Sequence, residues 1–527
     1  MAAAAAAAPS QWTESCVRLE RVCVDQGSII LYGASSSSGA GANGTDTGGS
    51  SAGSSTGSNA GGSGSSQPGV VPDAPGFRIE PDADRRKYDG FFTPAPIRVR
   101  PASADPGREG AAYLRQPIFS RCTVPVVWYS MWPTNFAHMF RDNAAKLWGV
   151  LRRTPWARHL KLALVTAEEL ALPGFSLDIF QPMLQLRVES WADFSARLPS
   201  RQLPDGSHVP LGWPESGGSA ASRLPLSWEG GAQRCFEQLF VCHRGLNITS
   251  WPLHGLGQHL VQRHRQQGQG LPPQSPRSSG SSGSSGSSNR DSSTGGSSSS
   301  SQGSGSERVL RVVFLKRSSP DRQLLDTAEL LERCSGWRGS TAAGQRLLVR
   351  CSEVAVTNLA QGIAVAQEAD VLVSMHGANL ANGWLLWPGS AVIELQSCGF
   401  DAGAAHLQYP LFNLEDGDTQ VQWWLVSACD PAACTPGVDE LHSTADEVIW
   451  ARNRNLRIGW EPLAHVLQAA AEVAGDMAEY RRRWQQGRWW WWLGPGGELQ
   501  QVGPGRFTKM RCPAPWPASR AQSIADS

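Results

Sequence analysis

The chain has 527 residues, 40% of them hydrophobic, which is too much apolar material for one small core and indicates two domains. Its 47 lysines and arginines are balanced by 46 aspartates and glutamates, and the net charge of +1 gives no general electrostatic signal for nucleic acid or an anionic membrane. No apolar run is long enough to cross a membrane, and the opening alanine run lacks the basic start and leucine-rich centre of a signal peptide. We therefore expect no nucleic-acid partner and no membrane span in this chain.

Two tracts built almost wholly from Ser, Gly and small polar residues interrupt the chain at 34–66 and 278–306. Such segments do not bury enough apolar area to offset the entropy of ordering them, so both are predicted to be disordered insertions. They divide the chain into a head at 1–81, an N-terminal α/β lobe at 82–266, a linker at 267–306, a C-terminal Rossmann-like lobe at 307–493 and a tail at 494–527.

The N-terminal lobe is predicted to be a loosely regular α/β lobe. Three apolar runs have the length and composition of strands, and in one further stretch the apolar residues have the spacing of an amphipathic helix. The strands are expected at 124–128, 160–165 and 235–241, and the helix at 135–151.

The predicted helix carries polar side chains opposite its apolar stripe. At about 3.6 residues per turn, Asn135, His138 and Asp142 share that polar face. A histidine and an aspartate four residues apart can give an imidazole that a carboxylate holds and polarises, as a general base requires. The other interpretation is an ordinary surface helix, which has the same kind of polar face.

The C-terminal lobe alternates strand-like and helical apolar patterns. The strand runs are apolar on both faces, which is typical of parallel strands covered by helices, and the alternation predicts a Rossmann-like α/β lobe. Strands are expected at 309–315, 347–349, 371–375 and 391–395, and helices at 324–331, 359–369 and 379–386.

The strand at 371–375 ends in His376 and Gly377, and a helix begins almost at once. Backbone N–H groups at such a helix start attract phosphate, Gly377 would let a ligand approach the backbone, and His376 could donate to an anionic oxygen. The alternative is a strand-to-helix turn in which the glycine only relieves crowding.

Basic residues follow the strand that opens this lobe. Arg317 and Arg322 lie beyond its carboxyl end, where ligands bind in parallel sheets, and the planar guanidinium group suits a diphosphate. Glu394 lies inside the apolar strand at 391–395 and needs a partner, either a ligand hydroxyl such as that of a ribose or a protein donor.

The 11 cysteines show no CxxC pair and no zinc-ligand spacing, so no metal site is predicted. Cys16 with Cys23, Cys235 with Cys242 and Cys429 with Cys434 could form short-range disulfides in an oxidising compartment, and buried thiols are the other interpretation. A long helix is expected at 462–484. The tryptophans at 489–492 could stack on sugar rings or serve as packing.

Taken together, these motifs resemble glycosyltransferase family 61, which includes the plant core β-1,2-xylosyltransferase, xylan arabinosyl- and xylosyltransferases and animal O-linked N-acetylglucosaminyltransferases. The resemblance covers about residues 124–395, with gaps. The matching motifs are the Asn-x-x-His-x-x-x-Asp helix with Asn135, His138 and Asp142, the paired arginines 317 and 322, Gln361, the strand entering His376, Gly377, Ala378 and Asn379, and the Ile-Glu pair ending at Glu394.

The resemblance implies an inverting glycosyltransferase of GT-B type, with two Rossmann-like lobes facing a cleft. It implies transfer of a sugar of the xylose, arabinose or N-acetylglucosamine class from a UDP-sugar to a glycan or glycoprotein acceptor, with no required cofactor and no strict need for a metal. The family also implies the Golgi or secretory lumen, although its usual N-terminal anchor is not visible in this sequence.

The resemblance also assigns expected roles. Arg317 and Arg322 would bind the diphosphate, the 376–379 turn would lie near the phosphates, and Glu394 would lie near the ribose or act as a structural anchor. His138 or Asp142 would be the base facing the acceptor, and Asn135 and Gln361 would complete the substrate-binding residues. Ala360 and Asn379 depart from the family's glutamate and glycine, and this departure motivates the alternative of a non-catalytic glycan- or nucleotide-binding protein that retains the fold. A nucleotide-dependent oxidoreductase on the Rossmann-like lobe is a further alternative, which the missing GxGxxG fingerprint disfavours.

Overall fold

The computed structural model divides into two compact units, residues 1–256 and 257–527, each of which is described by itself. The tracts 34–66 and 278–306, expected to be disordered, lie outside the residues that the structure describes. The described residues are 16–32, 77–79, 96–103, 111–115, 117–166, 171–197, 200–202, 208–210, 234–243, 252–268, 308–400, 420–436, 451–503 and 512.

The first unit is built on a mixed sheet of eight strands. Strands β10, β5, β6 and β7 are parallel to one another, and β1 joins them antiparallel through β10. The head expected at 1–81 is therefore not separate, because it supplies β1, β2 and β3 to this sheet. In spatial order the strands are β3 (Phe77–Ile79), β4 (Ile97–Pro101), β2 (Ser28–Leu31), β1 (Cys16–Asp25), β10 (Cys235–Cys242), β5 (Val124–Tyr129), β6 (Leu160–Val165) and β7 (Glu189–Ser190).

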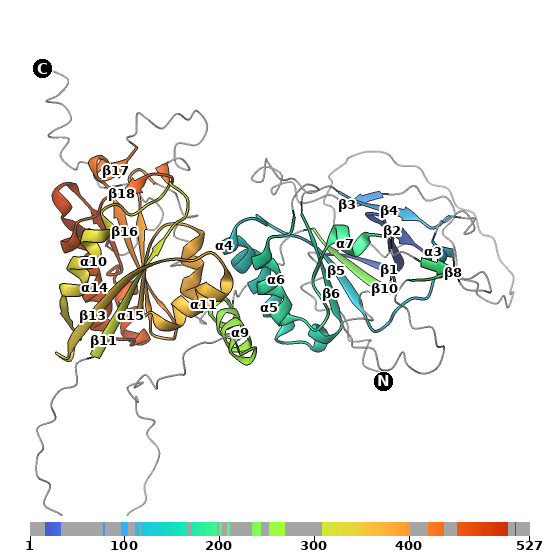
Figure 1. The fold of residues 1–527 in the computed structure, drawn as a ribbon, viewed down its shortest axis with the longest axis horizontal. Coiled ribbons are helices and arrows are strands. Elements are labelled where there is room, and N and C mark those ends of the chain that lie inside the picture. The colour runs from blue at the N-terminus through green and yellow to red at the C-terminus, as the bar shows by residue number, and fades with distance from the viewer. Residues whose placement is uncertain are drawn as a thin grey trace, which may run out of the picture. The chain divides into compact units, whose positions relative to one another are not determined.

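Helices cover both faces of this sheet because its central strands are apolar on both sides. All six residues of β6 are buried, and five of the six in β5. Figure 1 shows α4 (Phe136–His138), α5 (Lys146–Leu151) and α6 (Gly174–Phe180) on one face and α7 (Trp191–Ser195) on the other. This unit also contains a short helix, α3 (Ala112–Arg115), two 3-10 helices (Pro155–Arg158 and Gln181–Met183) and a two-stranded sheet of β8 (Ser200–Gln202) and β9 (His208–Pro210).

The second unit contains the alternating α/β lobe that the sequence predicts. Its six central strands are parallel, with an antiparallel strand at each edge, and β14 has the predicted bounds. The α/β fold class is thus confirmed. In spatial order the strands are β12 (Arg338–Ser340), β13 (Arg346–Ala355), β11 (Arg308–Lys316), β14 (Val371–Met375), β15 (Ala391–Gln396), β16 (Gln422–Ala428), β19 (Trp490–Leu493) and β20 (Leu499–Gln501), while β17 (Cys434–Thr435) pairs with β18 (Asn455–Leu456).

Two helical layers enclose the second sheet (Figure 1). One face carries α10 (Thr327–Gly336), α14 (Trp460–Val473) and α15 (Met477–Gln485), and the other carries α11 (Leu359–Glu368) with the end of α9 (Leu253–Gln266). The unit boundary falls inside α9, whereas all residues up to 266 are predicted from the sequence to belong to the first lobe. Gly257 explains the packing of this helix, because a Cβ there would lie 2.0 Å from the carbonyl oxygen of Trp384.

Three helices differ from the predictions. The helix expected at 462–484 is two helices, because Ala474 and Gly475 take left-handed φ values of 51° and 90°. The helix after Gly377 is a 3-10 helix, Ala378–Leu385, and the one expected at 135–151 contains a π-helix, Met139–Ala145, between α4 and α5. None of the described helices is long and apolar enough to span a bilayer.

The tryptophans at 489–492 belong to the core. All four side chains are at most 5% exposed, and three of them form β19, so the structure supports packing over stacking on sugars. The tail expected from 494 is also part of the second unit, because β20 extends its sheet and Cys512 forms a disulfide with Cys429.

The cysteines form five disulfides, and the short-range pairings proposed from the sequence are wrong. Cys16 bonds to Cys242 and Cys23 to Cys235, because these residues face each other across the antiparallel strands β1 and β10. Seven residues apart on an extended strand, Cys16 and Cys23 are about 23 Å apart and cannot reach each other. The remaining bonds are Cys334–Cys351, Cys398–Cys434 and Cys429–Cys512, and Cys122 is a free, exposed thiol.

Candidate functional site

The site residues predicted for the second unit lie at the carboxyl ends of adjacent parallel strands. Arg317 and Arg322 follow β11, His376 and Gly377 follow the neighbouring strand β14, and Glu394 lies near the end of the next strand, β15. The topology of a parallel sheet therefore brings together segments that are up to 77 positions apart in the chain, as expected for a ligand site at this edge.

Gly377 is the point at which the two arginines meet. A Cβ on this residue would lie 2.2 Å from Nη1 of Arg317 and 3.4 Å from Nη1 of Arg322, so the guanidinium group of Arg317 would have to shift if residue 377 carried a side chain. Its φ of 156° with ψ of −176° is also a backbone region that glycine alone adopts readily. The backbone conformation therefore favours glycine at this position, and the absence of a side chain leaves room for the Arg317 guanidinium group.

The loop that carries the arginines is held in shape by an amide. Nε2 of Gln323 donates to the carbonyl oxygens of Arg317, at 3.0 Å, and of Ser319. The backbone N–H of Gln323 donates to Oδ1 of Asn455, at 2.7 Å, from strand β18. Gln323 and Asn455 were not identified from the sequence, because neither residue type signals a loop anchor and Asn455 lies 132 positions further along the chain.

The guanidinium groups of Arg317 and Arg322 both lie close to Gly377. An anion bound beside them would accept charge-assisted hydrogen bonds from planar donors that suit a phosphate group.

His376 is fixed by Glu394. Nδ1 of His376 lies 2.6 Å from Oε1 of Glu394, whose side chain is fully buried. The carboxylate also accepts from Nε1 of Trp423, at 2.9 Å, and from Nε2 of Gln396, at 3.1 Å. The sequence left two kinds of partner open for Glu394, a ligand hydroxyl and a protein donor, and the structure has protein donors.

The other predicted residues of this unit make local contacts. The side chain of Asn379 is half-buried, and the backbone carbonyl oxygen of this residue accepts from Nδ2 of Asn382 at 2.8 Å. Ala378 and Asn379 begin the 3-10 helix, where the first N–H groups have no intrahelical acceptor. Gln361 lies in the first turn of α11, and its Oε1 accepts from the backbone N–H and the hydroxyl of Thr357 at 3.0 and 2.8 Å.

In the first unit, His138 and Asp142 form the expected pair. Nδ1 of His138 lies 2.5 Å from Oδ2 of Asp142, and Arg141 donates to both oxygens of the same carboxylate, at 2.8 and 2.7 Å. Burial by itself would raise the pKa of Asp142, but the hydrogen bond from His138 and the charge and hydrogen bonds of Arg141 outweigh it and hold that pKa well below its usual range. Asp142 is therefore a firmly ionised carboxylate.

Two further features hold this pair in place. The indole of Trp132, at a left-handed φ of 52°, stacks on His138 with ring centroids 5.1 Å apart. Asn135 caps α4, its Oδ1 accepting from the N–H groups of Ala137 and His138 at 3.0 and 3.3 Å. Asn135 thus has a structural role at the start of the helix that carries His138.

Asn143 ties the loop after β5 to the π-helix. Its fully buried amide accepts from Nε1 of Trp128 and from the N–H of Met131, and it donates to the carbonyl oxygens of Met131 and His138, at 2.9 to 3.1 Å. No sequence pattern indicates this role, because a regular α-helix would not place Asn143 toward that loop. The π-helix Met139–Ala145 changes the direction in which the side chains point.

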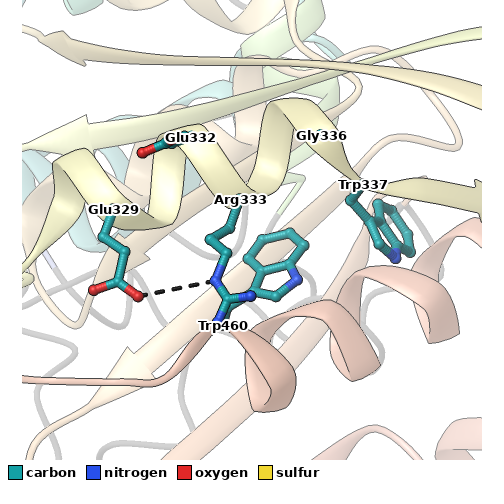
Figure 2. Close-up of a pocket in the computed structure, with 6 residues that line it drawn as sticks. All are labelled: Glu329, Glu332, Arg333, Gly336, Trp337 and Trp460. Atoms are coloured by element: carbon teal, nitrogen blue, oxygen red, sulfur yellow. Dashed lines mark ion pairs between the residues drawn. The ribbon is translucent and has the colours of Figure 1, made fainter.

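A separate surface pocket lies over α10 and α14 and holds none of the predicted site residues. Figure 2 shows Glu329, Glu332 and Arg333 on α10, with Trp337 just beyond it and Trp460 at the start of α14. Among the residues that the structure describes, no three His, Cys, Asp or Glu side chains are grouped as a metal ion would require.

A family model described as Glycosyltransferase 61 matches residues 136–393, from the start of α4 to within β15. The matched range includes His138, Asp142, both arginines and the 376–379 turn, whereas Asn135 and Glu394 each lie one residue outside it. No curated protein sequence matches the chain.

Proposed function

Because the chain belongs to glycosyltransferase family 61 and is therefore a transferase enzyme, we propose that it moves a sugar from a UDP-sugar to a glycan or glycoprotein acceptor with inversion at the anomeric carbon. The observation that carries the proposal is the meeting of Arg317 and Arg322 over Gly377. The sugar is of the xylose, arabinose or N-acetylglucosamine class.

The second unit is the donor side in this proposal. As the bond between the anomeric carbon and the diphosphate breaks, negative charge develops on the leaving UDP, and preorganised cations stabilise it. Arg317 and Arg322 supply two such charges, and the first N–H groups of the 3-10 helix add dipoles beside them. These residues stabilise the negative charge on the leaving UDP, so the reaction has no strict requirement for a metal ion.

The first unit is the acceptor side, and the geometry favours His138 as the base. The side chain of Asp142 is only 6% exposed and both of its oxygens are engaged, whereas His138 is 27% exposed. With Nδ1 donating to Asp142, Nε2 of His138 would accept the proton of the acceptor hydroxyl as its oxygen attacks the anomeric carbon. Asp142 orients the imidazole and stabilises its charged form.

The architecture and the compartment are part of the same proposal. Two α/β units, each with helices on both faces of its sheet, support a GT-B arrangement in which donor and acceptor bind to different lobes. Five disulfides favour an oxidising compartment, so the enzyme acts in the Golgi or the secretory lumen.

UDP binding tests the donor side. Isothermal titration should give an affinity for UDP that falls about tenfold or more in Arg317→Ala and in Arg322→Ala, since each charge-assisted bond contributes about 1.5–3 kcal/mol. Arg333→Ala, which removes an exposed arginine on α10, is the matched control and should leave UDP affinity unchanged. UDP release in the presence of acceptor, measured with a panel of UDP-sugars, identifies the donor.

The proposal is overturned if Arg317→Ala binds UDP as well as the wild type and no UDP-sugar is hydrolysed or transferred. If UDP binds but no sugar is transferred to any glycan acceptor, the chain is a nucleotide-binding protein that retains the fold.

A further inference from the structure

The surface pocket over α10 and α14 lies on the outer helical layer of the second unit (Figure 2). Its volume of about 580 Å³ is within the range of roughly 300–1,000 Å³ that is usual for ligand sites, and it opens to solvent. None of the residues assigned above to the donor side line it. This α10/α14 pocket is lined by Glu329, Glu332, Arg333, Gly336, Trp337 and Trp460.

Two tryptophans give the α10/α14 pocket an aromatic wall. Trp337 follows α10 and Trp460 begins α14, and their ring centroids lie 6.2 Å apart with the ring planes inclined by 71°. Both side chains are half-buried, and neither indole N–H donates to any residue that the structure describes. An indole of this kind can pack against an apolar surface and also donate a hydrogen bond to a ligand.

The indole of Trp337 is held in place by the chain that follows it. A Cβ on Gly339 in β12 would lie 2.6 Å from Cη2 of Trp337, so the ring lies directly against this strand. Nη1 of Arg338 donates to the carbonyl oxygen of Trp337 at 3.0 Å and restrains the turn after α10. An aromatic side chain that is already ordered loses little entropy when a ligand binds to it.

The polar groups of the α10/α14 pocket include both donors and acceptors. Arg333 extends from α10 toward the start of α14, and its guanidinium group forms ion pairs with Glu329 at 3.9 Å and with Glu461 at 3.5 Å (Figure 2). Its side chain remains 51% exposed. The lining has two carboxylates, those of Glu329 and Glu332, and one guanidinium group, which disfavours an anionic ligand.

We infer that the α10/α14 pocket binds a neutral oligosaccharide. The C–H groups on one side of a sugar ring form an apolar surface that packs on the indoles of Trp337 and Trp460. Each sugar hydroxyl both donates and accepts, so the hydroxyls bind to the carboxylate of Glu329 and to the guanidinium group of Arg333 alike. An ionised phosphate would use only the donors of the pocket, and an ammonium group only its acceptors.

The site is additional to the proposed transfer chemistry, since none of its residues takes part in that reaction. Only the choice of sugar rests on the proposed function. Because the pocket opens to solvent, it accommodates part of a glycan chain that continues beyond it. The ligand is therefore a segment of a glycan chain and not a nucleotide-sugar.

Fluorine NMR of the full chain labelled with fluorotryptophan locates the bound sugar. Single substitutions by phenylalanine assign the signals of Trp132, Trp337 and Trp460, and hexasaccharides of xylose, of arabinose or of N-acetylglucosamine are then added. At least one hexasaccharide should shift the signals of Trp337 and Trp460. Trp132, which stacks on His138, reports on the proposed acceptor side in the same spectrum.

If the signals of Trp337 and Trp460 do not shift with any of the three sugars, the inference is wrong. A shift of Trp132 alone would then show that sugar binds only beside His138, which leaves the proposed function intact. If hexalysine shifts the signals of Trp337 and Trp460 and no hexasaccharide does, the pocket binds cations and the inference is wrong.

Filling the pocket should prevent binding without harming the fold. Gly336 lies in the last turn of α10, and a Cβ there meets nothing within 4 Å, so Gly336→Gln places a long side chain in the pocket. Titration calorimetry should show hexasaccharide affinity reduced about tenfold or more, while the melting temperature does not fall, because glutamine is a better helix former than glycine. Gly336→Ala is the matched control and should reduce the affinity less than about twofold. Equal affinity in Gly336→Gln and the wild type would overturn the inference.

A set of variants separates this pocket from the donor side. Trp460→Ala and Arg333→Ala should each weaken hexasaccharide binding about threefold or more, because each removes a contact to the sugar, and both should keep the UDP affinity of the wild type. Arg317→Ala should keep the hexasaccharide affinity of the wild type, whether or not the chain binds UDP. Failure of the proposed function therefore leaves this test unaffected, whereas unchanged hexasaccharide binding in both Trp460→Ala and Arg333→Ala would contradict the inference.

Discussion

Nδ1 of His138 and Oδ2 of Asp142 lie 2.5 Å apart at the point where an α-helix passes into a π-helix. Arg141 is hydrogen bonded to the same carboxylate, so the imidazole is held by an anion that is itself held by a cation. Trp132 stacks on the ring and limits its rotation. An imidazole fixed in this way has a defined tautomer, which a general base needs and a solvated surface histidine lacks.

The first prediction concerns the base. His138→Ala should lower kcat for sugar transfer by about 10²- to 10⁴-fold, the usual contribution of general base catalysis, while UDP affinity stays unchanged. Asp142→Asn should lower kcat less, because the imidazole remains but loses its orienting anion. Steady-state kinetics with saturating donor and acceptor measure both effects. Equal kcat values in His138→Ala and the wild type would exclude His138.

The second prediction is an acid-dependent loss of stability. Because the pKa of Asp142 is lower in the folded chain than its unfolded value of about 3.9, the carboxylate stabilises the fold above that pH, and its contribution is lost as the pH falls toward the folded pKa. Asp142→Asn should therefore be less stable than the wild type at pH 7, and the difference should shrink below about pH 4. Thermal unfolding at pH 7 and pH 3 measures it, and a difference that stays constant or grows in acid would contradict the assignment.

The third prediction tests Asn143 as the link between the π-helix and the loop that carries Trp132. Asn143→Ala leaves four polar groups of Trp128, Met131 and His138 without this partner and should destabilise the first unit by about 3 kcal/mol. It should also reduce kcat, since Trp132 and His138 are no longer held together. Gln181→Ala, which removes two hydrogen bonds elsewhere in this unit, is the control. The control should lower the melting temperature less and leave kcat unchanged.

The sequence predicts the second unit well because its sheet is parallel and buried on both faces. A short continuous apolar run such as 371–375 has few stable alternatives to a strand buried on both faces. The carboxyl ends of such parallel strands lie at the same edge of the sheet. The grouping of Arg317, Arg322 and His376 follows from that topology. The approach of Arg317 and Arg322 to Gly377 does not, because it depends on the 317–326 loop being held by Asn455, which is distant in sequence.

The first unit is predicted less well for two physical reasons. Its sheet includes β1 and β2, which pair with each other but whose outer neighbours, β10 and β4, lie far away in the chain, so the head could not be assigned to the sheet from local patterns. The helix from 135 has the apolar spacing of an α-helix, and nothing local distinguishes a π-helix from it. The role of Asn143 depends on that difference, whereas the His138–Asp142 contact does not.

The fourth prediction concerns the disulfides between β1 and β10. Trypsin cleaves after Arg18 and Arg21, which separates Cys16 from Cys23, and cleavage after Glu237 by a glutamate-specific protease separates Cys235 from Cys242. Mass spectrometry of the unreduced double digest should therefore find Cys16 linked to Cys242 and Cys23 linked to Cys235. Peptides that join Cys16 to Cys235 would require a different register between the two strands and would contradict the sheet.

The last prediction concerns Gly377, where backbone conformation and ligand chemistry coincide. In Gly377→Ala the new methyl group would lie 2.2 Å from Nη1 of Arg317 and would also oppose a φ of 156°, so the arginine must move and the turn becomes strained. UDP affinity should fall about tenfold or more, which is what the loss of one charge-assisted contact costs, while thermal stability falls modestly. Gly336→Ala in α10, where a Cβ meets nothing within 4 Å, is the matched control and should bind UDP as the wild type does. If Gly377→Ala keeps full UDP affinity, the arginines do not bind the diphosphate at this turn, whatever the enzyme transfers.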